Sequence, residues 1–347
     1  MKALTVTPGQ VQSAQLRDVP EPSESDGPVL VEGIAVGICG TDVEIVNAEY
    51  GDAPPGVDYL VLGHENLGRV LEDPTGTFSA GDLIVGIVRR PDPVPCANCA
   101  AGEWDMCRNG EYTERGIKAR HGYCSQRWRI EPEFAVRLPA DTEDVGMLLE
   151  PTTVVAKAWE HVERIGSRAV FSPRTVLVTG AGPIGLLAAL LGVQRGLAVH
   201  VLDQVTDGPK PDLVHDLGAT YHSGSVDDLE LQPDIVIECT GVPAVVFAAM
   251  HHNGRDGIVC LTGVSSLGRT LSIDIGALNR EIVLENDVIF GSVNANRRHY
   301  EQGVDALAKA DRSWLQRLVT RRVPLDRFAE ALDRRPGDIK TVIELSG

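Results

Sequence analysis

Hydrophobic and polar positions change their period along the chain, and this change divides it into two parts. In the first part, short apolar runs of strand length are separated by Pro, Gly and Asp turn signals: Met1–Val6, Val29–Val36, Leu67–Leu71 and Leu83–Val88. Short strands at this spacing predict a small barrel or sandwich over residues 1–155. A further extended piece is expected after Val36, because Val43 and Ile45 have strand spacing.

The second part alternates buried strand runs with helical stretches, which predicts a parallel sheet. Helical spacing covers residues 152–165, and the strand runs follow from Arg174 onward: Thr175–Thr179, Ala198–Asp203, Asp234–Gly241, Gly257–Val264 and Val288–Asn294. Helices are predicted over Leu186–Arg195 and Tyr300–Ala310. The strand signal at Thr341–Leu345 suggests that the tail returns to the first unit, so the expected divisions are 1–155, 156–296 and 297–347.

Composition narrows the possible partners. The chain has 347 residues, 43% of them hydrophobic and 23% charged, with a formal net charge of -17. Such a chain is globular, and its negative charge argues against nucleic acid or an anionic membrane surface as partner. The longest apolar run, Ile184–Val193, is too short to cross a bilayer, and the N-terminal residues lack a signal-like pattern. We therefore expect a cytoplasmic protein whose seven cysteines are reduced.

The segment Gly37–Asp42 carries Cys39 directly after a predicted strand. A lone cysteine is more often a small buried apolar residue, but here His64 follows the apolar run Tyr59–Leu62, and Glu150 precedes Pro151. Thiolate, imidazole and carboxylate together could hold one zinc ion and leave a fourth position open, as catalytic zinc requires. The sequence therefore predicts a catalytic zinc site.

A second cluster, within residues 91–108, contains Cys96, Cys99 and Cys107. Two cysteines three positions apart with a third nearby predict a structural zinc lobe. Asp92 is the first candidate for its fourth ligand, and Cys124 is the other. If neither reaches, the lobe holds no metal.

A dinucleotide-binding turn lies between two predicted strands. Gly180, Gly182 and Gly185 follow a buried strand and open a helix, the setting in which such glycines bind a pyrophosphate. Asp203 ends the next strand, where a carboxylate accepts hydrogen bonds from ribose and repels a 2'-phosphate, so NAD is preferred over NADP. Lys210 is the only nearby cation. The further residues expected at the cofactor are Pro183, Ile184, Thr240, Gly241, Thr262, Val264 and Asn294.

The dense polar stretch Glu111–His121 has two readings. It could be a solvated loop, or it could be a substrate loop, because a polyol needs several convergent hydrogen-bonding groups.

Four motifs, in this order, resemble the zinc-dependent medium-chain dehydrogenase family over essentially the whole chain: Gly37–Asp42, Leu62–Glu65, the cysteine lobe and Gly180–Gly185. Within that family, Glu150-Pro151, Glu111–Gly122 and Gly291–Asn294 are similar to the glucose 1-dehydrogenase branch. The resemblance implies an α/β protein in which a GroES-like barrel catalytic domain joins a Rossmann doubly wound parallel-sheet domain. It also implies a homo-oligomer, either a dimer or a tetramer.

The resemblance assigns roles to individual residues. It implies that Cys39, His64 and Glu150 hold the catalytic zinc, that Thr41 relays the proton, and that Glu65 stands beside the metal and can exchange onto it. The implied sugar contacts are Glu114, Glu150 and Asn294.

The chain departs from the family at two places. The first of the four cysteines of the structural zinc is missing, with Asp92 and Pro93 near its place, and Val154 is apolar where a further sugar contact is expected.

Together these features predict a zinc-dependent oxidoreductase that oxidises an aldose, D-glucose first among them, at C1 to the aldonolactone with hydride transfer to NAD. A polyol or secondary-alcohol dehydrogenase is the alternative within the family. A non-catalytic NAD-binding protein is the alternative of another class, and it predicts the loss of metal ligands, whereas Cys39, His64 and Glu150 are all present.

Overall fold

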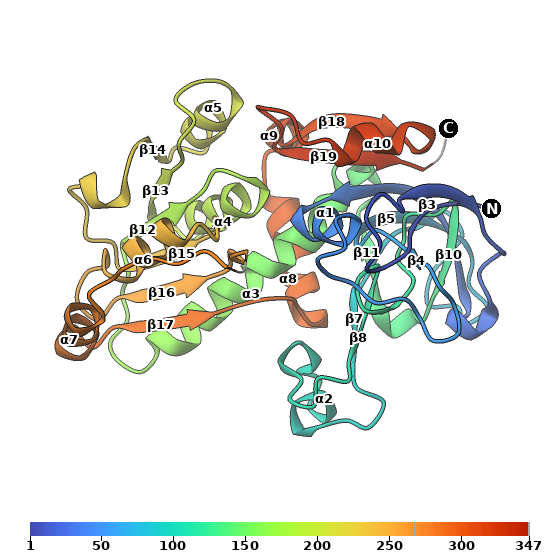
Figure 1. The fold of residues 1–347 in the computed structure, drawn as a ribbon, viewed down its shortest axis with the longest axis horizontal. Coiled ribbons are helices and arrows are strands. Elements are labelled where there is room, and N and C mark those ends of the chain that lie inside the picture. The colour runs from blue at the N-terminus through green and yellow to red at the C-terminus, as the bar shows by residue number, and fades with distance from the viewer. Residues whose placement is uncertain (267, 346–347) are drawn as a thin grey trace. The chain divides into compact units, whose positions relative to one another are not determined.

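The computed structural model describes residues 1–266 and 268–345, which form two compact units (Figure 1). The first unit comprises Met1–Glu150, Ala295–Leu307 and the segment from Leu318 onward, and the second comprises Pro151–Asn294 and Ala308–Arg317. The last two positions of the expected segment 297–347 lie outside the described residues.

The first unit is rich in short strands. Its strands are β1 (Lys2–Val6), β2 (Gln15–Asp18), β3 (Val29–Ile38), β4 (Leu60–Val61), β5 (Glu65–Glu72), β6 (Leu83–Gly86), β7 (Arg89–Arg90), β8 (Thr113–Arg115), β9 (Ala119–Arg120), β10 (Arg127–Ile130), β11 (Ala135–Leu138), β18 (Val319–Pro324) and β19 (Lys340–Glu344). Its helices are α1 (Gly40–Val46), α2 (Ala97–Ala100), α8 (Arg297–Lys309), whose last turn enters the second unit, and α10 (Phe328–Leu332).

Strand β3 is the centre of the largest sheet, which has the order β11-β6-β5-β3-β19-β18, with β10 also paired to β3. Apolar side chains alternate along β3, so that Val29 and Val31 are fully buried against the core of this unit. Strand β19 pairs antiparallel with β3, Thr341 opposite Ile38, so the C-terminal segment completes this sheet. The segment from Leu318 onward therefore belongs to the first unit.

The extended piece expected around Val43 and Ile45 is wrong, because this segment is the helix α1. Two apolar residues, two positions apart, are too few to distinguish the period of a strand from that of a helix. A strong N-terminal cap starts a helix here. The Thr41 N–H donates to the Cys39 sulfur at 3.3 Å, and the Asp42 carboxylate accepts the Cys39 N–H at 2.9 Å. These two bonds close a capping box that turns the chain out of β3.

The second unit alternates strands and helices as predicted. Its strands are β12 (Thr175–Thr179), β13 (Ala198–Leu202), β14 (Thr220–His222), β15 (Ile235–Glu238), β16 (Ile258–Leu261) and β17 (Val288–Gly291). Its helices are α3 (Leu149–Gly166), which starts at the end of the first unit, α4 (Pro183–Gln194), α5 (Pro209–Asp216), α6 (Pro243–Met250), α7 (Ile275–Glu285) and α9 (Arg312–Leu318).

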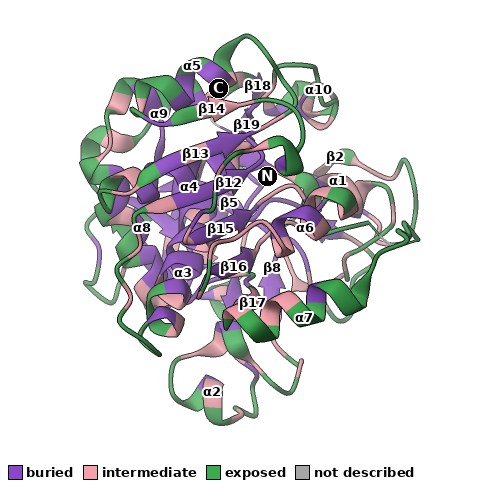
Figure 2. Cartoon of the chain, turned by 90° about the vertical axis from the view of Figure 1, so that its left-hand side faces the viewer, coloured by how far each residue is buried: buried purple, intermediate pink, exposed green. Residues whose placement is uncertain are grey.

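These strands form one parallel sheet of order β14-β13-β12-β15-β16-β17. In chain order within the unit this is 3-2-1-4-5-6, the doubly wound arrangement that binds dinucleotides where the order reverses. The central strands are buried, as parallel strands covered on both faces must be, while α7 is largely exposed (Figure 2). Across the described ranges, none of the helices combines the length and apolar character needed to cross a bilayer.

Candidate functional site

Three predicted site residues come together at one end of β3. Cys39 follows this strand directly, and its sulfur lies 3.0 Å from Nε2 of His64. Glu65, the first residue of β5, completes the group, and one ligand atom from each of the three lies within 4.8 Å of the others. The site is therefore built from two adjacent strand ends of the first unit.

Asp42 orients the imidazole of His64 from behind. Its Oδ1 lies 3.5 Å from Nδ1 of His64, and Asp42 itself is fully buried. Burial alone would lower the pKa of His64, but the negative charges of Cys39 and Asp42 raise it well above its usual value. Nε2 of His64 faces Cys39, while Nδ1 faces the Asp42 carboxylate. Metal-binding histidines commonly have a carboxylate at the nitrogen that does not bind the metal.

Glu65 forms a buried ion pair that the sequence did not reveal. Its two carboxylate oxygens lie 2.6 and 2.5 Å from Nζ of Lys340 on β19, and both side chains are at most 3% exposed. Gly37 makes room for this pair, because a Cβ atom there would lie 2.1 Å from Oε2 of Glu65. Lys340 also donates to the main-chain oxygen of Ile38 at 3.3 Å, next to Cys39.

Glu150 lies in the first turn of α3, so Pro151 marks the start of a helix and not a break. The residue is partly accessible, but the protein around its carboxyl group raises its pKa to about 7, against the opposing influence of His64 and Lys340. Glu65 adds to the upward shift in pKa. Glu150 is thus near enough to the Cys39 cluster to interact with it electrostatically, and its role as a ligand stays a prediction.

The chemistry of this donor set fits a zinc ion. A thiol, an imidazole and the carboxylate of Glu65 converge, and Lys340 is the positive side chain that pairs with this carboxylate. Thiolate and imidazole are preferred by zinc over magnesium or calcium, and a divalent cation would balance the acidic groups. Cys39, His64 and Glu65 lie close enough together to hold it, and Glu150 stays the third predicted ligand.

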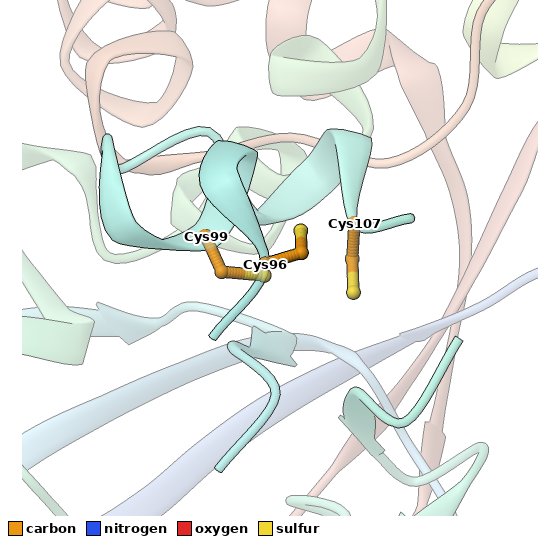
Figure 3. Close-up of side chains that lie close together, drawn as sticks. All are labelled: Cys96, Cys99 and Cys107. Carbon is orange, nitrogen blue, oxygen red and sulfur yellow. The ribbon is translucent and has the colours of Figure 1, made fainter. Parts of the chain in front are cut away.

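The cysteine lobe also brings three donors together. The sulfur atoms of Cys96, Cys99 and Cys107 lie within 4.8 Å of one another (Figure 3). The Arg108 N–H lies 3.4 Å from the Cys96 sulfur and is the main cause that lowers the pKa of this thiol to about 6. A thiolate already favoured at neutral pH suits zinc binding.

The two candidates for a fourth ligand are placed differently. Asp92 is buried near the lobe, and its Oδ1 accepts the Val94 N–H at 2.7 Å. Its Oδ2 is buried and accepts no hydrogen bond from the described residues, yet Asp92 is not in the group formed by the three sulfur atoms. Cys124 is fully buried in the apolar core of the first unit, which leaves Asp92 as the better candidate.

The dinucleotide turn in the second unit has the expected form. Gly180 has φ +92°, in the left-handed region, and a Cβ on Gly185 would lie 1.7 Å from the Gly180 oxygen. Gly182 has open space where its Cβ would be, and Pro183 and Ile184 open α4 after it. The N-terminus of this helix is therefore free of side chains where a pyrophosphate would bind.

Asp203 follows β13 and contacts this turn directly. Its Oδ2 accepts the Ala181 N–H at 2.6 Å and lies 3.0 Å from Nζ of Lys210 on α5. Both side chains of this ion pair are mostly buried, at 13 and 16% exposure. Burial raises the pKa of Asp203, but the Ala181 and Lys210 hydrogen bonds outweigh this and lower it. Lys210 thus neutralises much of the charge that was expected to act on the cofactor.

The other residues predicted to contact the cofactor follow the carboxyl ends of the next strands. The buried carboxylate of Glu238, which is not among the predicted site residues, accepts the Thr240 N–H at 2.6 Å and the Gly241 N–H at 3.2 Å. The Thr262 hydroxyl donates to the Glu238 main-chain oxygen at 2.8 Å. Val264 is 75% exposed, and Asn294, after β17, has φ +63°.

The polar stretch around Glu114 is ordered by internal contacts. Glu114 is buried on β8 and pairs with Arg89 at 3.0 Å, and the Arg89 guanidinium lies over the Tyr112 ring at 3.7 Å. This stretch is therefore a folded part of the first unit and not a loose solvated loop.

Comparison with known proteins identifies the family. The family model "Glucose dehydrogenase C-terminus" matches residues 143–345, and "Alcohol dehydrogenase GroES-like domain" matches residues 25–140, which confirms the expected GroES-like domain. Glucose 1-dehydrogenase from Methanocella arvoryzae is 38% identical, with 99% of both chains covered, and glucose 1-dehydrogenase 2 from Vulcanisaeta moutnovskia is 40% identical, with 99% of both covered. The structure of Haloferax mediterranei glucose dehydrogenase in complex with NADP, Zn and gluconolactone superimposes with a TM-score of 0.92, at 33% identity and full coverage of both chains. This chain therefore belongs to the zinc-dependent medium-chain dehydrogenase family, in its glucose 1-dehydrogenase branch.

Proposed function

We propose that the protein oxidises D-glucose at C1 to gluconolactone, with transfer of a hydride to the nicotinamide of NAD(P) and release of a proton. The observation that carries this proposal is the full-length similarity to a relative whose structure contains NADP, Zn and gluconolactone together. The predicted zinc donors Cys39, His64 and Glu150 are present in this chain, and the dinucleotide turn at Gly180–Gly185 is intact.

This proposal assigns a role to each of the predicted catalytic and sugar-binding residues. Asp42 keeps the His64 ring oriented, and Lys340 holds Glu65 beside the site. A bound zinc ion supplies the Lewis acidity that lowers the pKa of a substrate hydroxyl. Thr41, whose N–H is fixed on the Cys39 sulfur, offers the hydroxyl that passes the proton toward solvent. Glu114 and Asn294, together with Glu150, orient the sugar.

Steady-state turnover on a panel of aldoses, polyols and secondary alcohols, each with NAD and NADP, tests this proposal. We expect glucose to give the highest kcat/KM, with lactone as the first product. A higher value for a polyol or a simple secondary alcohol would assign the enzyme to another activity of the family. Absence of turnover by zinc-loaded protein on the whole panel would favour a non-catalytic NAD-binding role.

We also propose that the lobe of Cys96, Cys99 and Cys107 holds a second zinc ion, with Asp92 as its fourth ligand. The native protein should then contain about two zinc ions per subunit, and Cys99→Ser should reduce this content to about one. Elemental analysis of dialysed protein measures both, with Cys260→Ala, a buried thiol of β16, as the control. A native content of one that Cys99→Ser leaves unchanged would show that the lobe holds no metal.

The cofactor preference follows from the pair of Asp203 and Lys210. We propose that NAD is preferred, because a 2'-phosphate would bring about two negative charges toward Asp203. Lys210, at 3.0 Å, makes this preference smaller than a free carboxylate would give. Lys210→Met should raise the NAD/NADP ratio of kcat/KM by about fivefold, or about 1 kcal/mol, and Asp203→Ser should lower it by at least about tenfold.

Kinetics with both cofactors checks this pair of opposite effects. Arg195→Met is the control, since Arg195 caps the far end of α4 and pairs with Glu163. If Lys210→Met favoured NADP, or if Asp203→Ser left the ratio unchanged, the proposed basis of the preference would be wrong.

We further propose a cytoplasmic homo-oligomer, either a dimer or a tetramer. All seven cysteines are free thiols, as in a reducing compartment. The helix α7 exposes Ile275, Val283 and Leu284, each at least 60% accessible, and an apolar surface of this kind is typical of subunit contacts. Sedimentation of the native protein measures the number of subunits.

A further inference from the structure

The first unit contains a pocket of about 250 Å³ that none of the proposed roles uses. It lies among the loop before β3, the strand β8 and the turn around β9. Its polar and charged lining residues are Ser25, Asp26, Thr113, Arg115, Arg120 and His121, and Pro54 and Ala119 complete it. A pocket of this size admits several water molecules, so a small polar ligand fits.

Arg115 is the central group of this pocket, and it is only 3% exposed. Its guanidinium donates to main-chain oxygens alone: to Arg129 at 2.8 Å, to His121 at 3.3 Å and to Asp26 at 3.5 Å. Among the described residues it has no carboxylate at ion-pair distance, and its Nε–H is buried without a hydrogen-bond partner. The guanidinium also lies over the Tyr123 ring, 5.2 Å from its centroid, so these contacts are all to neutral groups. A buried guanidinium without a counter-ion costs free energy unless an anion reaches it.

The surroundings do not cancel this positive charge. Glu131 is shared between Arg90, at 3.0 Å, and Arg120, at 2.6 Å. These two arginines and Arg115 outnumber the carboxylates of Glu131 and Asp26 by one. Nε of Arg120 is also buried without a partner. In a chain with a net charge of -17, this pocket is therefore a local positive region.

The other lining groups can donate to an anion as well. Nδ1 of His121 accepts the Val61 N–H at 3.2 Å, so the neutral ring carries its proton on Nε2. Burial lowers the pKa of His121, which keeps it in this neutral form. Thr113 and Ser25 add two hydroxyl groups to the lining, of which that of Ser25 donates to the Ser23 hydroxyl at 2.9 Å in this structure.

We propose that this pocket binds a small oxyanion of the phosphate class, either inorganic phosphate or a phosphate monoester, with Arg115 and Arg120 as its charged ligands. Two arginines, a neutral imidazole donor and two hydroxyl groups match the several acceptor oxygens of a phosphate. Five lining residues belong to the stretch Glu111–His121, but none of them is among the proposed sugar contacts Glu114, Glu150 and Asn294 or the zinc donors, so the inference is separate from both of these roles.

Isothermal titration of the native, metal-loaded protein with inorganic phosphate at constant ionic strength tests the proposal. We expect saturable binding of about one phosphate per subunit. Methyl phosphate serves as the monoester probe: tighter binding of methyl phosphate would identify an ester as the ligand, and tighter binding of inorganic phosphate would identify the free ion.

Two variants should change the affinity in opposite directions without disturbing buried contacts. Asp26→Asn removes the one negative side chain of the lining and should tighten phosphate binding by about fivefold, whereas Ser25→Asp adds a charge at an exposed position and should weaken it by about fivefold. Arg115→Lys keeps the positive charge but loses the planar guanidinium with its several N–H donors, and should weaken phosphate binding by about tenfold or more. Arg327→Gln, a charge change at a position that is 60% exposed elsewhere in the same unit, is the matched control.

Three results would overturn the proposal. The first is the absence of saturable phosphate binding to the native protein. The second is an affinity that neither Asp26→Asn nor Ser25→Asp changes. The third is equal displacement of phosphate by chloride at the same ionic strength, which would reveal a general salt effect.

Discussion

Cys39→Ser and His64→Ala should each lower kcat/KM for glucose by at least about a thousandfold, while the fold and the binding of the dinucleotide remain. Lewis-acid stabilisation by a catalytic zinc amounts to several kcal/mol, and each 1.36 kcal/mol is tenfold in rate. Either substitution removes one of the two side chains that meet at 3.0 Å in the site. The dinucleotide turn lies in the second unit and is untouched.

Zinc analysis and cofactor titration separate this effect from unfolding. Each variant should contain one zinc ion fewer per subunit than the native protein and should bind NAD(H) with unchanged affinity. Cys260→Ala, which removes a buried thiol of the second unit, is the control and should keep both zinc content and turnover. Near-normal turnover in either variant would remove the catalytic zinc from the proposal.

The dinucleotide turn could be predicted from the sequence because its determinants are local. Gly180, Gly182 and Gly185 are required by the backbone of one turn and its helix, so strand, turn and helix signals stand next to one another in the chain. The parallel direction of the strands in the second unit follows from the same repetition, since each crossover helix brings the chain back to begin the next strand in the same direction.

The helix α1 could not be predicted from the hydrophobic period, because a side-chain cap at its N-terminus determines it. Val43 and Ile45 are too few to distinguish strand from helix, whereas the bonds among Cys39, Thr41 and Asp42 decide the conformation. The same cap places the Cys39 sulfur and aligns Asp42 behind His64. The bonds that make this segment a helix, contrary to the prediction, are therefore the ones that also build the site.

Lys340 and Glu238 could not be found from the sequence, for different reasons. Lys340 stands 275 residues from Glu65 and meets it only because β19 pairs with β3. Glu238 ends a buried strand, and its charge is stabilised by amides and hydroxyl groups of the turn that follows. The tertiary fold supplies the partner of Lys340, whereas these partners of Glu238 are groups of the next three residues whose direction depends on the conformation of the turn. A lysine or glutamate in a strand pattern carries no information about either.

The buried pair of Lys340 and Glu65 gives the largest stability effect that we expect. Lys340→Met leaves the Glu65 carboxylate buried without its cation, which should lower the free energy of unfolding by about 3–5 kcal/mol and the Tm by roughly 10 °C. The double variant Glu65→Gln/Lys340→Met removes both charges and should recover much of this loss.

Thermal unfolding of the metal-loaded variants measures this coupling between the two side chains. Lys2→Met is the matched control, because Lys2 pairs with Asp18 at the same 2.6 Å but with both side chains largely accessible, and it should cost less than about 1 kcal/mol. The comparison isolates burial as the cause, since the two single variants make the same chemical change. If Lys340→Met were as stable as Lys2→Met, or if the double variant were less stable than Lys340→Met, then Lys340 would not be the group that keeps Glu65 charged beside the site.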